Sequence, residues 1–380
     1  MRDFAHTEAI RKLPRGSRNA TCTLILTRQC NLHCSYCYER HKDYRSMDLE
    51  TAVRCLDEQI DRVLADEGVS WLCVELFGGE PLLQFKLVQE LVAWTRSNAR
   101  GCPIMFMVIS NGTLLTEEKK AWFRENKDMI VLCVSYDGSA EAQTVNRGVQ
   151  VSDALEFCHG EWPDMAFRMT ISPDSVEHLA DYIRDSARQG YQLRTQLANE
   201  VKWTERHREL LEQQLKILKK ACLEDEGLLP LVFAPFYEGG EDSELPCAQR
   251  CGAGVLKVCY DVDGEKYPCN MFSPLSAGVR ALKWGEYQPS DARNHNDAGC
   301  ELCPIKHGCY TCPAANYIYR EHCGIRDHSM CRMKLTLALI SIEFQVEKLM
   351  QATLTRQDVA KLKALVRIYD KIHLKLEQNA

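Results

Sequence analysis

Short apolar runs alternate with longer amphipathic segments along the first two hundred residues of the chain. The apolar runs are rich in β-branched and aromatic residues, which favours strands, and they lie at residues 21–27, 71–77, 104–110, 130–135, 166–171 and 191–197. The segments between them are long enough for helices, and the clearest one, residues 48–65, begins with Asp48 as a helix N-cap. Six strands joined by crossover helices predict an α/β fold with a parallel sheet, either open or curled into part of a barrel.

The pattern changes after residue 200. Residues 204–223 have the pattern of a charged amphipathic helix, and the run GGEDSE at 239–244 indicates a boundary. Residues 247–331 are rich in Cys, Pro and Gly with little periodicity, which is typical of a small domain folded around metal, and helical patterns return at 333–350 and 356–376. We therefore expect five parts: an N-terminal arm (1–20), an α/β domain (21–200), a connecting helix and linker (201–246), a Cys-rich domain (247–333) and a C-terminal helix pair (334–380).

Composition narrows the class of protein. The 380 residues are 45% hydrophobic and 26% charged, with 47 basic and 53 acidic side chains, so we expect a globular protein and no nucleic-acid partner. No apolar run approaches the ~18 residues of a membrane span, and the charged N-terminus does not resemble a signal peptide, so we expect a cytoplasmic protein with no membrane partner. Twenty cysteines in a reducing compartment indicate metal or iron–sulfur ligation more than disulfides.

Three of these cysteines directly follow the first predicted strand. Cys30, Cys34 and Cys37, here called the triad, have the spacing C-x3-C-x2-C. A [4Fe–4S] cluster usually takes four thiolates, so three from one loop leave an iron with an open position. A zinc site completed by His33 or His41 is the alternative, although zinc knuckles favour paired C-x2-C spacings.

The triad resembles the signature of the radical S-adenosylmethionine (radical SAM) enzymes. The resemblance implies a partial (β/α)6 TIM-type barrel, a cluster whose open iron binds S-adenosylmethionine, and a flavodoxin- or ferredoxin-type reductant. It also implies cleavage of that cofactor to a 5′-deoxyadenosyl radical, which abstracts hydrogen from a substrate. Tyr36, within the triad loop, is expected to lie against the adenine.

Other positions at predicted strand ends match the same family. Gly78-Gly79-Glu80-Pro81 would bind the methionine ammonium group, Ser135 would bind the ribose, and Arg147 would pair with the carboxylate. A plain turn would also use Gly and Pro, and Arg147 could be a surface arginine. The full set of expected cofactor contacts is Tyr36, Gly78, Gly79, Glu80, Ser110, Asn111, Ser135, Arg147 and Leu197.

The C-terminal cysteines resemble a SPASM domain, which holds two auxiliary [4Fe–4S] clusters and would bring the total to three. The resemblance implies that Cys247, Cys251, Cys269 and Cys312 bind the first auxiliary cluster, and that Cys300, Cys303, Cys309 and Cys331 bind the second. Cys312 follows Cys309 by one residue fewer than is usual in the family, and Cys323 competes with Cys331. We choose Cys331 because it directly precedes the helix predicted from Met333, whose free N–H groups favour an anion. Two zinc knuckles are the alternative, and the nine other cysteines are expected to be buried apolar residues.

The resemblance implies an enzyme that modifies a ribosomally made peptide. The product would be a thioether or carbon–carbon crosslink on a Cys-containing precursor peptide. The first alternative is a sulfatase-maturating enzyme that makes formylglycine, but such enzymes place an aspartate as base where this chain has Asn270, so Asp261 or Asp263 would have to replace it. Crosslinking is therefore favoured, and the catalytic base is left unassigned. A zinc-knuckle binding protein and a ferredoxin-like electron carrier are the remaining alternatives.

Overall fold

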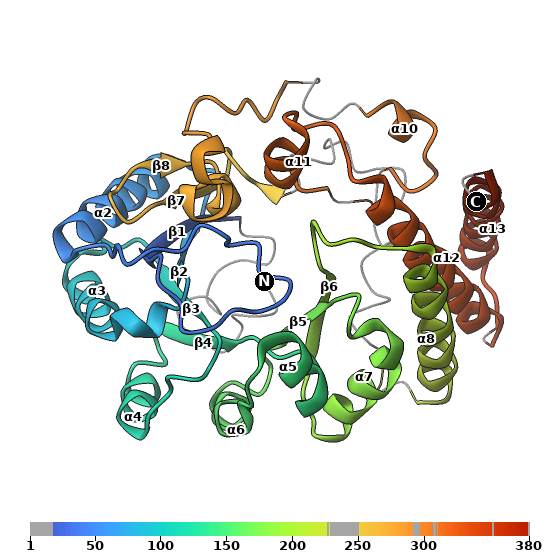
Figure 1. Ribbon diagram of the computed structural model, residues 1–380, viewed down its shortest axis with the longest axis horizontal. Coiled ribbons are helices and arrows are strands. Elements are labelled where there is room, and N and C mark those ends of the chain that lie inside the picture. The colour runs from blue at the N-terminus through green and yellow to red at the C-terminus, as the bar shows by residue number, and fades with distance from the viewer. Residues whose placement is uncertain are drawn as a thin grey trace. The chain divides into compact units, whose positions relative to one another are not determined.

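The computed structural model describes residues 18–225, 228, 251–291, 297–306, 309, 311–351 and 353–378 (Figure 1). Most of the expected N-terminal arm, the boundary at 239–244 and Cys247 lie outside the described residues. The chain divides into two compact units. The first consists of the residues up to Tyr136 with Arg147–Arg168 and Gly252–Pro289, and the second of Asp137–Asn146, Met169–Cys251 and Ser290–Ala380.

The first unit is built on a six-stranded sheet with the order β4-β3-β2-β1-β7-β8. Its strands are β1 (Asn19–Thr27), β2 (Trp71–Gly78), β3 (Ile104–Ser110), β4 (Ile130–Val134), β7 (Lys257–Tyr260) and β8 (Lys266–Tyr267). All neighbours are parallel except β7 and β8, which are antiparallel. The central strands are buried along almost their whole length, which explains why they are continuous apolar runs in the sequence.

The first unit also contains helices, most of which connect its strands along the chain. They are α2 (Leu49–Ala65), α3 (Phe85–Asn98), α4 (Glu117–Glu125), α6 (Ser152–Glu161) and the short α9 (Pro274–Ala277), together with the 3-10 turn η2 (Pro81–Gln84). Helix α2 begins where expected because the Asp48 side chain accepts the Thr51 N–H, and Leu56, Ile60 and Val63 lie on its buried face. Each such buried side chain stabilises the fold by about 1.5–3 kcal/mol.

The order of strands continues from β4 through an isolated parallel bridge between Ser135 and Arg168. Arg168 belongs to β5 (Phe167–Ile171), which pairs with β6 (Leu193–Leu197) in a two-stranded sheet. All six strands expected from the sequence are present, and the α/β partial-barrel fold is confirmed. The sequence did not predict β7, which pairs with β1 although it lies within the region expected to form the Cys-rich domain.

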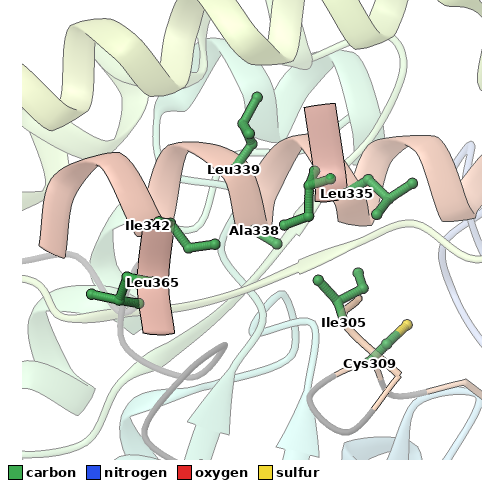
Figure 2. Packing of buried hydrophobic residues seen from close by; sticks show 8 residues of the cluster. Ile305, Cys309, Leu335, Ala338, Leu339, Ile342 and Leu365 are labelled. Carbon is green, nitrogen blue, oxygen red and sulfur yellow. The ribbon is translucent and has the colours of Figure 1, made fainter. Parts of the chain in front are cut away.

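The second unit contains most of the C-terminal helices. Its helices are α5 (Ala140–Arg147, whose last residue belongs to the first unit), α7 (Leu179–Arg188), α8 (Glu205–Glu224), α10 (Ala298–Glu301), α11 (Pro313–Arg320), α12 (His328–Met350) and α13 (Arg356–Gln378). Figure 2 shows that Ile305 and Cys309 of the cysteine-rich loop share one apolar cluster with side chains of α12 and α13 such as Leu335 and Leu365. The expected helix pair is therefore present and packs on the loop that carries the cysteines.

The start of the first C-terminal helix differs from the expectation. Helix α12 begins at His328, earlier than the expected Met333, because the Asp327 side chain caps it by accepting the Ser329 and Met330 N–H groups.

The nine cysteines outside the expected ligand sets are all buried: Cys22, Cys55, Cys73, Cys102, Cys133, Cys158, Cys222, Cys259 and Cys323. Within the described part of the chain, we find no helix that combines the length and apolarity needed to span a membrane.

Candidate active site

The residues expected to bind cofactor gather where the parallel strands end. The triad follows β1, Gly78 ends β2, Ser110 ends β3 and Ser135 follows β4. Thr27 pairs with Gly78, and Ser110 pairs with Val134, so these strand ends lie at one edge of the sheet. Leu197 is the last residue of β6 and is buried in the second unit. Loops at the carboxyl edge of a parallel α/β fold are the usual place for an active site.

The Gly-Gly pair lets the loop after β2 lie directly against the triad loop. The Gly79 N–H donates to the Thr27 carbonyl (2.9 Å), and the Glu80 N–H donates to the Gln29 carbonyl (2.9 Å). A Cβ on Gly78 would overlap the Thr27 carbonyl, and a Cβ on Gly79 would overlap the Gln29 carbonyl. Glycine is therefore required at both positions, because any side chain would push the triad loop away from β2.

Glu80 joins the loops that follow β2 and β3. Its side chain is 1% exposed and accepts hydrogen bonds from the Leu82 N–H (3.0 Å), the Ser110 hydroxyl (2.8 Å) and the Asn111 N–H (2.8 Å). Burial raises the pKa of Glu80, and these hydrogen bonds oppose the rise. The Asn111 amide in turn donates to Asn31 inside the triad loop (2.9 Å). The Glu80 carboxylate thus holds three loops together through contacts within the chain.

The triad thiols lie in a tight turn. The Cys37 N–H donates to the Cys34 carbonyl (3.1 Å), and the Leu32 N–H donates to the Cys30 sulfur (3.4 Å). Burial raises the pKa of Cys30 and of Cys37, while the nearby Lys42 ammonium lowers it. Among the described residues, no group of three or more His, Cys, Asp or Glu side chains is already arranged to hold a metal ion. Three thiolates from one loop are nonetheless the donor set that an iron–sulfur cluster uses.

An unpartnered acceptor lies beside the triad. Glu39 is 6% exposed, and its Oε1 atom has no hydrogen-bond partner among the described residues. Burial raises its pKa well above the usual range, and the Lys42 charge opposes that rise. A buried carboxylate oxygen without a donor is costly, so its place beside the triad suits the binding of a group that carries N–H donors and positive charge. Sequence reasoning missed Glu39, although its position two residues after Cys37 was a usable signal.

Arg147 lies over the ring of Tyr36, with 5.3 Å between its guanidinium carbon and the ring centroid. The structure therefore brings together two of the expected cofactor contacts, one from the triad loop and one from the end of α5. A cation over an aromatic face is stabilised by about 0.5–2 kcal/mol and holds both groups in place.

In the second unit, Cys300, Cys303, Cys309 and Cys331 line one cavity of about 520 Å³. Burial raises the pKa of Cys300 to about 11 and that of Cys331 to about 12, and the charges of the neighbouring thiols add to both. The cavity is also lined by the cationic side chains Arg208, Arg326, Arg332 and Lys375. Four thiols among cations suit an anionic cluster. Cys331 does not precede α12 as expected but lies in its first turn, where its N–H donates to the Asp327 carbonyl.

Cys312 has a different environment. It is the N-cap of α11, and its sulfur accepts the Ala315 N–H (3.4 Å), which favours the thiolate at the positive end of the helix. The charges of Cys251 and Cys312 are close enough that the Cys251 thiol adds to the rise in the Cys312 pKa caused by burial. The Cys312 charge likewise adds to the rise in the Cys323 pKa that burial causes. Cys269 is buried in the first unit, near Cys259.

The structure also locates the residues that bear on a catalytic base. The Asn270 amide donates to the hydroxyl of Tyr38, the residue after Cys37 (3.1 Å). Asp261 is fully buried and forms an ion pair with Arg28, which favours a structural role for it over that of a base. Asp263 is exposed in the turn between β7 and β8, where it accepts the Glu265 N–H (3.0 Å).

Comparison with known proteins identifies the family of the domain that carries the triad. Residues 24–184 match the model of the Radical SAM superfamily, so the chain carries a radical SAM domain. It is 24% identical over 271 residues to the antilisterial bacteriocin subtilosin biosynthesis protein AlbA of Bacillus subtilis, covering 66% of this chain and 54% of that protein. It is 33% identical over 119 residues to the serine-type anaerobic sulfatase-maturating enzyme of Bacteroides thetaiotaomicron, covering 30% of this chain and 28% of that enzyme. The chain therefore spans about half or less of these curated relatives.

A solved structure shows the same fold. Native anSMEcpe with bound AdoMet and Cp18Cys peptide superposes with a TM-score of 0.63 at 18% identity, over 87% of this chain and 98% of that chain. This likeness extends beyond residues 24–184 and includes most of the C-terminal half.

Proposed function

We propose that the protein is a radical SAM maturase that modifies a side chain of a ribosomally made peptide. The observation that carries the proposal is the joining of the triad loop to the Gly78-Gly79-Glu80 and Ser110-Asn111 loops at the carboxyl edge of the sheet. The names of the similar proteins support a peptide substrate, since AlbA is a bacteriocin biosynthesis protein and anSMEcpe binds a peptide together with AdoMet.

In this proposal the triad holds a [4Fe–4S] cluster with one open iron, to which S-adenosylmethionine binds. When bound, the cluster and this cofactor supply a 5′-deoxyadenosyl radical that takes hydrogen from the substrate. Glu39 would accept a hydrogen bond from the methionine ammonium group, since its Oε1 atom has no donor within the described chain. Arg147 and Tyr36 would hold the carboxylate and the adenine, while Ser135 and Leu197 would contact the ribose and the adenine. Gly78, Gly79 and Glu80 would also bind that ammonium group, and Glu80 holds the loops around this site together.

The C-terminal cysteines would bind two auxiliary [4Fe–4S] clusters. Cys300, Cys303, Cys309 and Cys331 would hold the second, which the shared cavity supports. Cys247, Cys251, Cys269 and Cys312 would hold the first, and the thiolate-stabilising cap position of Cys312 supports its place in that set. A flavodoxin- or ferredoxin-type protein would supply electrons.

Crosslinking through a cysteine of the peptide is the reaction that we favour. Formylglycine formation needs a proton acceptor at the oxidised residue, whereas Asn270 presents an amide that is bound to Tyr38. Asp261, the buried alternative, is held in an ion pair with Arg28. The second candidate remains the sulfatase-maturating reaction, which the match to the Bacteroides enzyme favours.

Co-expression with a short peptide encoded beside this gene, followed by mass spectrometry of the peptide, tests the proposal. We expect a peptide that has lost two hydrogens and one alkylatable thiol. A matched expression with the triad changed to alanine should return the unmodified peptide. A formylglycine product would instead establish the second candidate.

A further inference from the structure

A buried arginine lies among the thiols of the second auxiliary site. Arg326 is 6% exposed and lines the same cavity as Cys300, Cys303, Cys309 and Cys331. Its Nη1 atom lies 3.9 Å from the Cys309 sulfur, with the N–H donating. The arginine therefore reaches a ligand of the proposed cluster directly, from the loop that precedes α12.

The backbone holds this arginine in place. The Arg326 N–H donates to Asp297 Oδ2 (3.0 Å), and the other oxygen of the same carboxylate accepts the Gly299 N–H (2.8 Å), directly before Cys300. Asp297 is itself 9% exposed and caps α10. One buried carboxylate thus fixes the loop that carries Arg326 against the loop that carries Cys300.

Three other cations line the cavity with Arg326. Arg332 and Arg208 both form ion pairs with Glu205 (2.6 and 2.5 Å), and Lys375 donates to the Gly299 carbonyl (2.8 Å). Arg326 donates to a thiol of the cavity, that of Cys309, and its charge also acts on the Asp297 carboxylate. Arg326 therefore brings both an N–H donor and a positive charge to the sulfur atoms.

A buried positive charge and an N–H donor at a cluster sulfur favour the more negative state of the cluster. Reduction adds one electron and breaks no bond, so both interactions are stronger after reduction than before it. We propose that Arg326 raises the reduction potential of the second auxiliary cluster by donating to Cys309 and placing its charge against the four thiolates. This inference rests on the proposed ligand set, and it makes Arg326 a positioning and tuning residue, not a ligand.

The test is a redox titration of the full-length protein, reconstituted anaerobically with iron and sulfide. Each variant is titrated with dithionite and followed by electron paramagnetic resonance, and Cys300→Ala identifies the signal of the second auxiliary cluster by removing it. In Arg326→Met we expect the ratio of reduced to oxidised cluster, measured at the wild-type midpoint, to fall about tenfold. For a one-electron couple this corresponds to a shift of about 59 mV to lower potential.

Two further variants separate charge from hydrogen bonding. Arg326→Lys keeps the charge and Arg326→Gln keeps an N–H donor, so both should shift the potential less than Arg326→Met does. Arg188→Met is the matched control, because it removes an arginine of the same unit that pairs with Asp185 (2.8 Å) and does not line the cavity. Its potential should equal that of the wild type.

An unchanged potential in Arg326→Met, at wild-type iron content, would overturn the inference and leave the ligand set standing. If Arg326→Met does not hold its iron, the potentials of Arg326→Lys and Arg326→Gln test the inference in its place. Wild-type potentials in both of these variants would overturn the inference. If wild-type protein shows no signal that Cys300→Ala removes, the proposed ligand set fails and the inference fails with it. That last outcome contradicts the proposed second auxiliary cluster, and none of these outcomes contradicts the proposed peptide modification at the triad.

Discussion

The buried ion pair between Arg28 and Asp261 gives a prediction that separates a structural role from a catalytic one. Arg28 follows β1, two residues before Cys30, and Asp261 follows β7, so the pair joins the ends of two neighbouring strands. Burial alone would lower the pKa of Arg28, but the hydrogen bond and charge of Asp261 raise it. We therefore expect Asp261 to hold the triad loop in position and to take no proton from a substrate.

The expected loss of stability follows from the burial of the ion pair. The side chains of Arg28 and Asp261 are 4% and 0% exposed, and removing one member of such a pair costs about 3–5 kcal/mol because the other charge remains buried. Asp43, 3.3 Å from Arg28, remains as a partner, so we expect Asp261→Asn to cost about 3 kcal/mol, at the lower end of that range. For a unit of about 200 residues this is a fall of roughly 6–12 °C in melting temperature. Replacing both residues by apolar ones, as in Arg28→Met with Asp261→Leu, should recover most of the loss.

The assay combines anaerobic thermal unfolding with peptide turnover, normalised to folded protein and to iron content. The single variant should be less stable and lose turnover only in proportion to its folded fraction, and the double variant should recover both. If Asp261 were the base, the double variant would fold and bind iron yet remain inactive. That result would refute the structural role.

Three further predictions concern the metal, the cofactor and pH. Reconstituted wild-type protein should bind about 12 iron atoms and the triad-to-alanine variant about 8, as measured by iron analysis, and an equal content in the two would contradict the first site. Glu39→Gln should weaken S-adenosylmethionine binding by ~10-fold or more, because a hydrogen bond to a charged group contributes about 1.5–3 kcal/mol. Anaerobic equilibrium dialysis at unchanged iron content measures this affinity. An affinity equal to that of the wild type would remove Glu39 from the site. Burial alone would raise the pKa of Glu75, but Lys257 and other donors lower it to about 2, so its contribution to stability is present at neutral pH and is lost as the pH falls from about 4.5 towards 2. Glu75→Gln should flatten the fall in melting temperature over that range, and a slope equal to that of the wild type would show that Glu75 is not responsible.

The sequence predicts the elements that depend on local pattern. The six strands and α2 follow from continuous apolar runs and from a capping aspartate, both of which are readable within about ten residues. The start of α12 was readable in the same way, because Asp327 stands before Ser329 as a cap, but the apolar run from Met333 is the more obvious signal.

Contacts across long separations were not predictable from one sequence. Strand β7 has only four residues, and its pairing with β1 depends on backbone partners more than two hundred residues away. The same holds for Arg28 with Asp261, which are 233 residues apart, and for Asn270 with Tyr38, which are 232 apart. No local pattern marks these residues as partners, so the sequence could offer Asp261 as a base without showing its ion pair with Arg28.

The most direct test of the central claim is mass spectrometry of a Cys-containing partner peptide after anaerobic reaction with the reconstituted protein, dithionite and S-adenosylmethionine. The account predicts release of 5′-deoxyadenosine and a peptide that has lost two hydrogens and one alkylatable thiol, both absent with the triad variant. Turnover of a sulfatase-type peptide to formylglycine, or equal release of 5′-deoxyadenosine by the wild type and the triad variant, would contradict it.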